Sequence, residues 1–122
     1  MSFQGFILTL SSRDPDGLQG FYRDLVGLVP MFDFSPGAFG LNAASQEPFL
    51  LIEEHSEVDA RAREPERVLL NLLVDDIAFE ESRLRSRGVE FDRAAYEEPG
   101  VGMFATFRDL DGNLCQLVQL FG

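Results

Sequence analysis

The sequence predicts an α+β fold in which two tandem βαβββ modules form mixed sheets with helices on their outer faces. Two observations support this prediction. The order of an apolar strand, a helical stretch and several short strands occurs twice along the chain. The glycines that end the two helical stretches, Gly27 and Gly88, are 61 residues apart, and the aspartates that precede the stretches, Asp14 and Asp76, are 62 apart. A repeat with a spacing of about half the chain indicates a duplicated structural unit.

Each module begins with an apolar strand that leads into a helix. We expect these strands at residues 6–10 and 68–74. The two aspartates fit the N-cap position, because a short acceptor side chain there binds free backbone N–H groups of the first turn. Pro15 supports a helix start, and the two glycines favour the left-handed backbone of a helix end. In the second helix, Glu81 and Arg85 have the i,i+4 spacing of an exposed ion pair.

After each helix the pattern changes to short strands separated by turn residues. We expect these strands at residues 29–34, 38–43, 48–55, 89–92, 102–107 and 113–120. Ser35–Gly37 and Asp109–Asn113 have the composition of turns. The chain is expected to form a single domain, residues 1–122, with modules at 3–55 and 67–121 and a polar linker at 56–66. Each sheet then has one face under its helix and one face free for a ligand.

Composition and charge limit the possible functions. A chain of 122 residues, 45% of them hydrophobic, can bury a sizeable core, and a single cysteine, Cys115, excludes an internal disulfide. The formal net charge of -11 repels a phosphate backbone, so nucleic acid is not an expected partner. No apolar run reaches the roughly 18 residues of a membrane span, and the N-terminal residues lack the pattern of a signal peptide. We therefore expect a cytoplasmic protein without a membrane partner.

Four motifs occur in order along nearly the whole chain. They are Asp14 with FYRDLVGL at residues 21–28, VDD at 74–76, GVEF at 88–91 and FRDLDGNL at 107–114. Together they resemble the vicinal oxygen chelate superfamily, which includes glyoxalase I, extradiol dioxygenases, fosfomycin-resistance enzymes and bleomycin-resistance binding proteins. The resemblance implies curved, U-shaped sheets and a homodimer with two pockets. It leaves the reaction open, because fold and function are separable.

The resemblance also indicates where a metal would bind. Members with metal chemistry place His, Glu or Gln ligands on the first and last strands of the modules. The corresponding residues are Ile7, Leu69, Gln116 and, on the strand at 48–55, Glu53. Two of these side chains are aliphatic and a third is uncharged, and the chain has only one histidine and one cysteine. Because zinc and non-haem iron sites need several such donors, we expect neither a metal nor another cofactor.

Strand alternation predicts what lines the free faces instead. Ile7, Thr9, Leu69, Asn71 and Gln116 share the parity that points away from the helices. A mostly aliphatic wall with a few uncharged polar groups is typical of a site for an organic molecule. For Asn71, the alternative is a buried amide held by backbone groups. Further candidates for stacking on a planar ligand, with a core position as their alternative, are Phe32, Phe34, Phe39 and Phe104.

The sequence therefore favours a metal-free protein, similar to the bleomycin-resistance branch, that binds a small organic ligand. Its function would be to sequester an antibiotic or a toxic aromatic metabolite. The alternative is an enzyme of the same superfamily, such as a lyase or an isomerase, that uses Glu53 or His55 as a base or a metal ligand. The sequence favours a simpler interpretation of these two residues, a surface carboxylate and imidazole at a strand end, and it does not decide whether the ligand is transformed.

Overall fold

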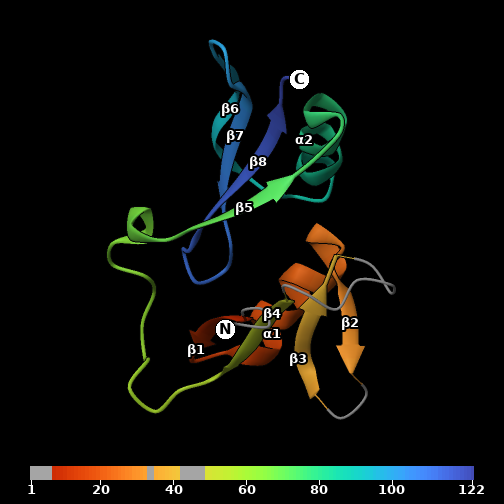
Figure 1. Cartoon of the computed structure of the whole chain (residues 1–122). Helices are drawn as coiled ribbons and strands as arrows, with labels where there is room; N and C mark the ends of the chain where they lie inside the picture. Colours follow the sequence, from red (N-terminus) through yellow and green to blue (C-terminus); the bar gives the residue numbers. More distant parts are fainter. Residues whose placement is uncertain (1–6, 33–34, 42–48) are drawn as a thin grey trace, which may run out of the picture. The chain divides into compact units, whose positions relative to one another are not determined.

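The computed structural model describes residues 7–32, 35–41 and 49–122, and the chain forms two compact units, Met1–Ala60 and Arg61–Gly122 (Figure 1). The first unit contains β1 (Ile7–Ser12), α1 (Pro15–Gly20), η1 (Phe21–Val26), β2 (Val29–Phe32), β3 (Ser35–Gly40) and β4 (Phe49–Glu54). The second contains η2 (Pro65–Arg67), β5 (Leu69–Leu73), α2 (Ile77–Ser86), β6 (Phe91–Glu98), β7 (Gly102–Arg108) and β8 (Leu114–Leu120). Of the two η segments, η1 is a π-helix and η2 a 3-10 helix.

The two sheets have the same topology. The strand order is β1-β4-β3-β2 in the first and β5-β8-β7-β6 in the second. In each sheet the first strand runs parallel to the last strand of its unit, and the other pairs are antiparallel. The predicted α+β fold, with two four-stranded mixed sheets built from βαβββ repeats, is therefore confirmed.

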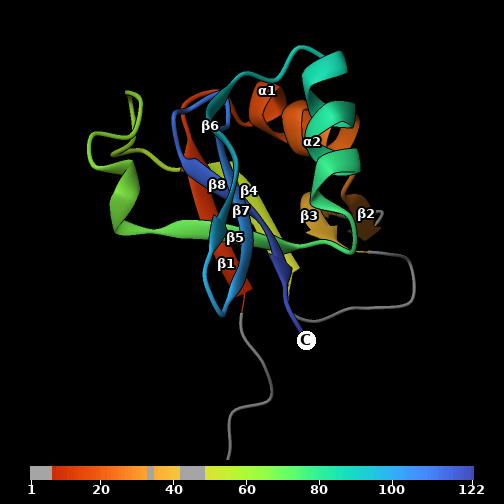
Figure 2. The ribbon, with the colours of Figure 1, turned by 90° about the horizontal axis from the view of Figure 1, so that it is seen from above.

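In each unit the helix covers one face of the sheet. α1 packs against β1, β3 and β4, and α2 packs against β6, β7 and β8 (Figure 1, Figure 2). The core beneath each helix is apolar, with Leu18 in the first unit and Leu84 and Phe107 in the second almost completely buried. Cys115 is also fully buried, as its strand parity predicts. Over the described ranges, no helix combines the length and the hydropathy that a membrane crossing requires.

The first helical segment differs from the single helix predicted to run up to Gly27. α1 ends at Gly20, and the chain continues as the π-helix η1. The N–H of Gly27 donates to the carbonyl of Tyr22 at 3.0 Å, five residues earlier, whereas an α-helix bonds four residues back. The wider turn buries Phe21, Tyr22 and Val26, so that the residue five positions after Phe21 lies in the core. Gly27 ends the segment as predicted, with a φ of 97°.

Two strands, β3 and β6, differ most from the predicted bounds. Residues 35–37, predicted as a turn, belong to β3. Gly37 is needed there because an added Cβ would collide with the carbonyl oxygen of Ile52, so this glycine allows two backbones to approach closely. β6 covers Phe91–Glu98 instead of the predicted 89–92. Bulges interrupt the alternation of its side chains, so the sequence pattern did not reveal the full length of the strand. The predicted strand and turn residues at 33–34 and 42–48 lie outside the described residues.

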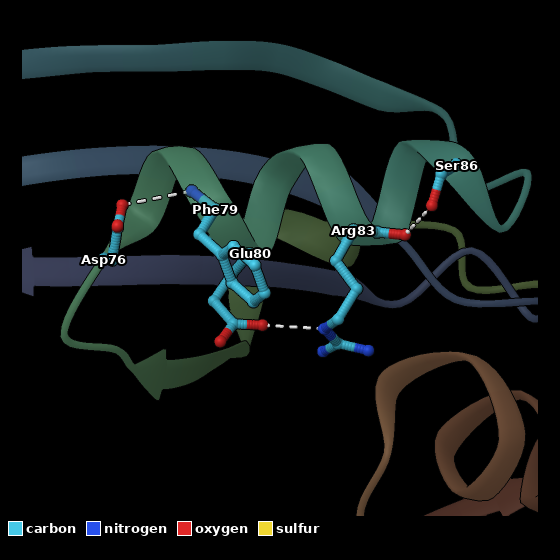
Figure 3. Close-up of polar contacts among 5 residues, drawn as sticks. All are labelled: Asp76, Phe79, Glu80, Arg83 and Ser86. Atoms are coloured by element: carbon cyan, nitrogen blue, oxygen red, sulfur yellow. Dashed lines mark hydrogen bonds and ion pairs between the residues drawn. The ribbon is translucent and has the colours of Figure 1, made fainter.

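The outer surface of α2 carries two ion pairs. Nε of Arg83 lies 2.8 Å from Oε1 of Glu80 (Figure 3). The predicted ion pair between Glu81 and Arg85 is also present, with Nε of Arg85 at 2.8 Å from Oε2 of Glu81. The side chain of Glu81 is only 14% exposed, less than predicted, because its other oxygen accepts a hydrogen bond from the N–H of Ala95. This second contact ties α2 to β6.

Both predicted N-caps are confirmed, and the cap of α2 gives a stability prediction. Oδ1 of Asp76 accepts a hydrogen bond from the N–H of Phe79 at 3.1 Å (Figure 3). Oδ1 of Asp14 accepts one from the N–H of Gly17 in the same way. Asp76→Ala should lower the free energy of unfolding by about 1 kcal/mol, measured by urea denaturation. The matched control is Asp75→Ala at the preceding, exposed position, and an equal loss in both variants would contradict the capping role.

Candidate functional site

The face of the second sheet that points away from α2 is exposed along its edge strand. On β5, Leu69, Asn71 and Leu73 are exposed, whereas Leu70 and Leu72 are half-buried on the helix side. This is the alternation expected from the sequence. Because β5 is in register with β8, its exposed residues continue as rows of side chains across the sheet.

Two such rows have opposite chemical character. The first, which we call the polar row, comprises Asn71 on β5, Gln116 on β8, Thr106 on β7 and Arg93 on β6. The second, which we call the apolar row, comprises Leu73, Val118, Phe104 and Tyr96 on the same strands. We call the two rows together the open face; within it, the side chain of Val118 is buried. An amide, a second amide, a hydroxyl and a guanidinium thus lie beside a strip of hydrocarbon and aromatic rings.

The β6 end of the open face is an aromatic cluster. The ring centroids of Tyr96 and Phe104 are 6.0 Å apart with planes inclined at 34°. The guanidinium carbon of Arg93 lies over the Tyr96 ring, 3.4 Å from its centroid. Both rings are half-buried, whereas Arg93 is exposed. The cluster therefore presents aromatic surface and a cation at the same place.

The first unit has a face of the same kind. On β1, Ile7 is 53% exposed and Thr9 is exposed, whereas Leu8 and Leu10 are half-buried on the helix side. Thr9 is in register with Leu51 of β4. The free side of β1 is thus aliphatic with one hydroxyl group, as the strand parity predicts.

The four candidate phenylalanines lie in different environments. Phe104 is in the apolar row. Phe39 is 1% exposed and is in register with the buried Leu50, so it belongs to the core under α1 and is not part of the site proposed below. Phe34 and the side chain of Phe32 lie outside the described residues.

Glu53 and His55 are exposed at the end of β4. Glu53 is in register with Ser11 of β1, and His55 is the first residue after the strand. Nδ1 of His55 accepts a hydrogen bond from the N–H of Glu57 at 3.1 Å, which leaves the proton of the neutral ring on Nε2. A solvated carboxylate and an imidazole bonded within a turn have the features of surface residues.

The donor set at the family's ligand positions does not fit a metal ion. Ile7 and Leu69 have hydrocarbon side chains without a coordinating atom, and the amide of Gln116 carries no charge. Glu53 alone supplies a carboxylate. Among the residues that the structure describes, no group of three His, Cys, Asp or Glu side chains could hold a metal. The chemistry of these faces is therefore the chemistry of hydrogen bonds, stacking and apolar contact.

Arg93 and Thr106 are candidate residues that the sequence pattern did not reveal. Thr106 could have been found, because it has the same strand parity as Phe104. Arg93 could not, because its place on the open face depends on the bulges of β6. The sequence DRAAYEE has no two-residue alternation from which its direction could be predicted.

The family model described as Glyoxalase/Bleomycin resistance protein/Dioxygenase superfamily matches residues 7–117, which is most of the chain. The chain matches no curated protein. Several solved structures have the same fold over almost their whole length. One is TnmS3, an antibiotic binding protein from Streptomyces sp. CB03234, with 23% identity, a TM-score of 0.75 and 99% of both chains covered.

Two other similar structures carry different functional names. A lactoylglutathione lyase from Agrobacterium tumefaciens has 19% identity and a TM-score of 0.69, with 93% of this chain and 91% of that chain covered. The fosfomycin resistance protein FosX from Listeria monocytogenes has 15% identity and a TM-score of 0.65, with 98% and 93% covered. At these identities the likeness shows the fold alone, and the function has to be argued from the site.

Proposed function

Because the chain belongs to the glyoxalase/bleomycin resistance protein/dioxygenase superfamily, we propose that it is a metal-free protein that binds a small organic molecule. The ligand would be an antibiotic or a toxic aromatic metabolite, and the protein would protect by sequestering it. The proposal includes a cytoplasmic homodimer, the assembly that the family resemblance implies for a chain of this length. The name of TnmS3, an antibiotic binding protein, supports the choice among the activities of the superfamily.

The observation that carries this proposal is the pairing of the polar row with the apolar row. Sites for organic ligands combine a mostly apolar wall with a few hydrogen-bonding groups that fix the orientation of the ligand. The apolar row supplies Phe104 and Tyr96 for stacking, and the polar row supplies the amides of Asn71 and Gln116. Leu69 on β5 is a proposed further apolar contact of this face. On the free side of β1 in the first unit, Ile7 and Thr9 are the proposed apolar and hydroxyl contacts.

The enzyme alternative has less support from the geometry. It requires Glu53 or His55 to contact a substrate as a base, and both residues are exposed at the end of β4. A general base in a water-excluding site holds its substrate within hydrogen-bond distance. Binding without turnover needs no such residue, and the two rows of the open face supply the contacts that binding requires.

The proposal predicts that aromatic antibiotics or metabolites raise the melting temperature of the purified chain. A ligand that binds only the native state adds about 2.7 kcal/mol when its concentration is 100 times Kd, which is on the order of a 10 °C shift for a domain of this size. Thermal-shift screening of aromatic natural products against an aliphatic control set measures this effect. If a compound raises the melting temperature but is consumed with turnover, the sequestration proposal is wrong.

A further inference from the structure

The position of Arg93 depends on a β-bulge. From Arg93 to Tyr96 the chain advances three residues on β6, whereas their partners Thr106 and Phe104 are two apart on β7. In a regular strand, residues three apart point to opposite faces. The extra residue on β6 brings Arg93 and Tyr96 to the same face, where the guanidinium lies over the ring.

Arg93 has no carboxylate partner within the part of the chain that the structure describes. The neighbouring carboxylate, Asp92, accepts a hydrogen bond from Nε of Arg108 at 2.7 Å. Arg13, Arg61 and Arg63 also have no carboxylate partner among the described residues, so what distinguishes Arg93 is the aromatic ring beneath its guanidinium. Stacking on Tyr96 fixes the plane of the guanidinium and leaves its N–H groups available, which is the arrangement that binds a carboxylate by two parallel hydrogen bonds.

We propose that the open face selects planar aromatic ligands that carry an anionic oxygen group, such as a carboxylate. The aromatic body of the ligand lies over Tyr96 and Phe104, and Arg93 donates hydrogen bonds to the anionic group at the end of the polar row. This inference rests on the proposed function and specifies the class of ligand. The net charge of -11 alone would favour cationic ligands, whereas the position of Arg93 favours anionic ones.

The net negative charge of the chain repels an anionic ligand, and the contact of the ligand with Arg93 has to outweigh this repulsion. At physiological ionic strength the Debye length is about 8 Å, so the distant carboxylates are largely screened. A carboxylate in contact with Arg93 is screened much less. The preference for an anionic ligand should therefore be measured at physiological salt, where the contact dominates.

Three probes of the same shape test the inference: 2-naphthoate, 2-naphthamide and 2-naphthylmethylammonium. We expect the purified full chain to bind the carboxylate roughly tenfold more tightly than the amide, and the ammonium most weakly, by calorimetric titration. Arg93→Gln should abolish the advantage of the carboxylate and leave the affinity for the amide nearly unchanged. Arg63→Gln, which removes the same charge from an exposed position between β4 and β5, should leave all three affinities unchanged.

The outcomes separate this inference from the proposed function. If the amide or the ammonium binds as tightly as the carboxylate, the anionic preference is wrong and the binding function stands. If Arg93→Gln weakens the carboxylate and the amide equally, Arg93 acts by holding Tyr96 and not by binding the anion. If none of the three probes, nor any compound of the thermal-shift screen, binds, the proposed function itself fails. Ring-proton shifts of Tyr96, with the fully buried Tyr22 as internal reference, report whether the probe lies on the open face.

Discussion

Replacing Phe107 by alanine is expected to lower the free energy of unfolding by about 3 to 5 kcal/mol. The side chain of Phe107 is completely buried on β7, and its ring centroid is 5.2 Å from that of Phe91. Truncation removes these contacts and leaves a cavity that the sheet on one side and α2 on the other cannot easily fill. Urea denaturation followed by circular dichroism measures the loss.

Phe79 provides the matched control for this substitution. It lies on α2 and is 62% exposed, so Phe79→Ala removes the same atoms from a surface position. We expect a change within about 0.5 kcal/mol. Similar losses of unfolding free energy in the two variants would contradict the assignment of Phe107 to the core.

Phe104→Ala is expected to weaken the binding of a neutral aromatic ligand, 2-naphthamide, by roughly tenfold, about 1.5 kcal/mol. Phe104 is three residues before Phe107 on β7 and therefore points to the opposite face of the sheet. On this open face its ring centroid lies 6.0 Å from that of Tyr96. The substitution removes one of the two aromatic surfaces proposed to contact the ligand. Calorimetric titration of the variant, compared with the parent chain, measures the change in Kd.

The choice of probe keeps this prediction independent of Arg93, because 2-naphthamide carries no charge. Phe104→Leu, which retains an apolar side chain without an aromatic ring, should lose part of the affinity. Phe79→Ala should bind 2-naphthamide as the parent does. An affinity for 2-naphthamide that is the same in Phe104→Ala and in the parent would remove the apolar row from the binding site.

Much of the fold was predictable because the residues at the helix ends and the sequence repeat indicate the same elements. Asp14 and Asp76 have the side chain that an N-cap requires, and Gly27 and Gly88 adopt the positive φ that favours glycine at a helix end. The two-residue periodicity of a strand predicted which side of β5 faces the helix. These signals lie within a few residues of one another, so a single sequence contains them.

The elements that were not predicted depend on contacts between distant segments. Gly37 has the appearance of a turn residue, but its lack of a side chain serves the approach of Ile52 from another strand. The direction of Arg93 depends on how β6 pairs with β7. The candidate site was therefore predictable on β5 and β8, where Asn71 and Gln116 follow regular alternation, and not on the bulged edge strand.

The measurement that tests the central claim most directly is a titration of one aromatic ligand into the purified protein before and after exhaustive chelation, with metal analysis of the same sample. The account predicts far less than one equivalent of divalent metal and the same dissociation constant in both titrations, because the side chains of the open face make the contacts. A full equivalent of bound metal, together with loss of ligand binding or of catalytic turnover once it is stripped, would contradict the account.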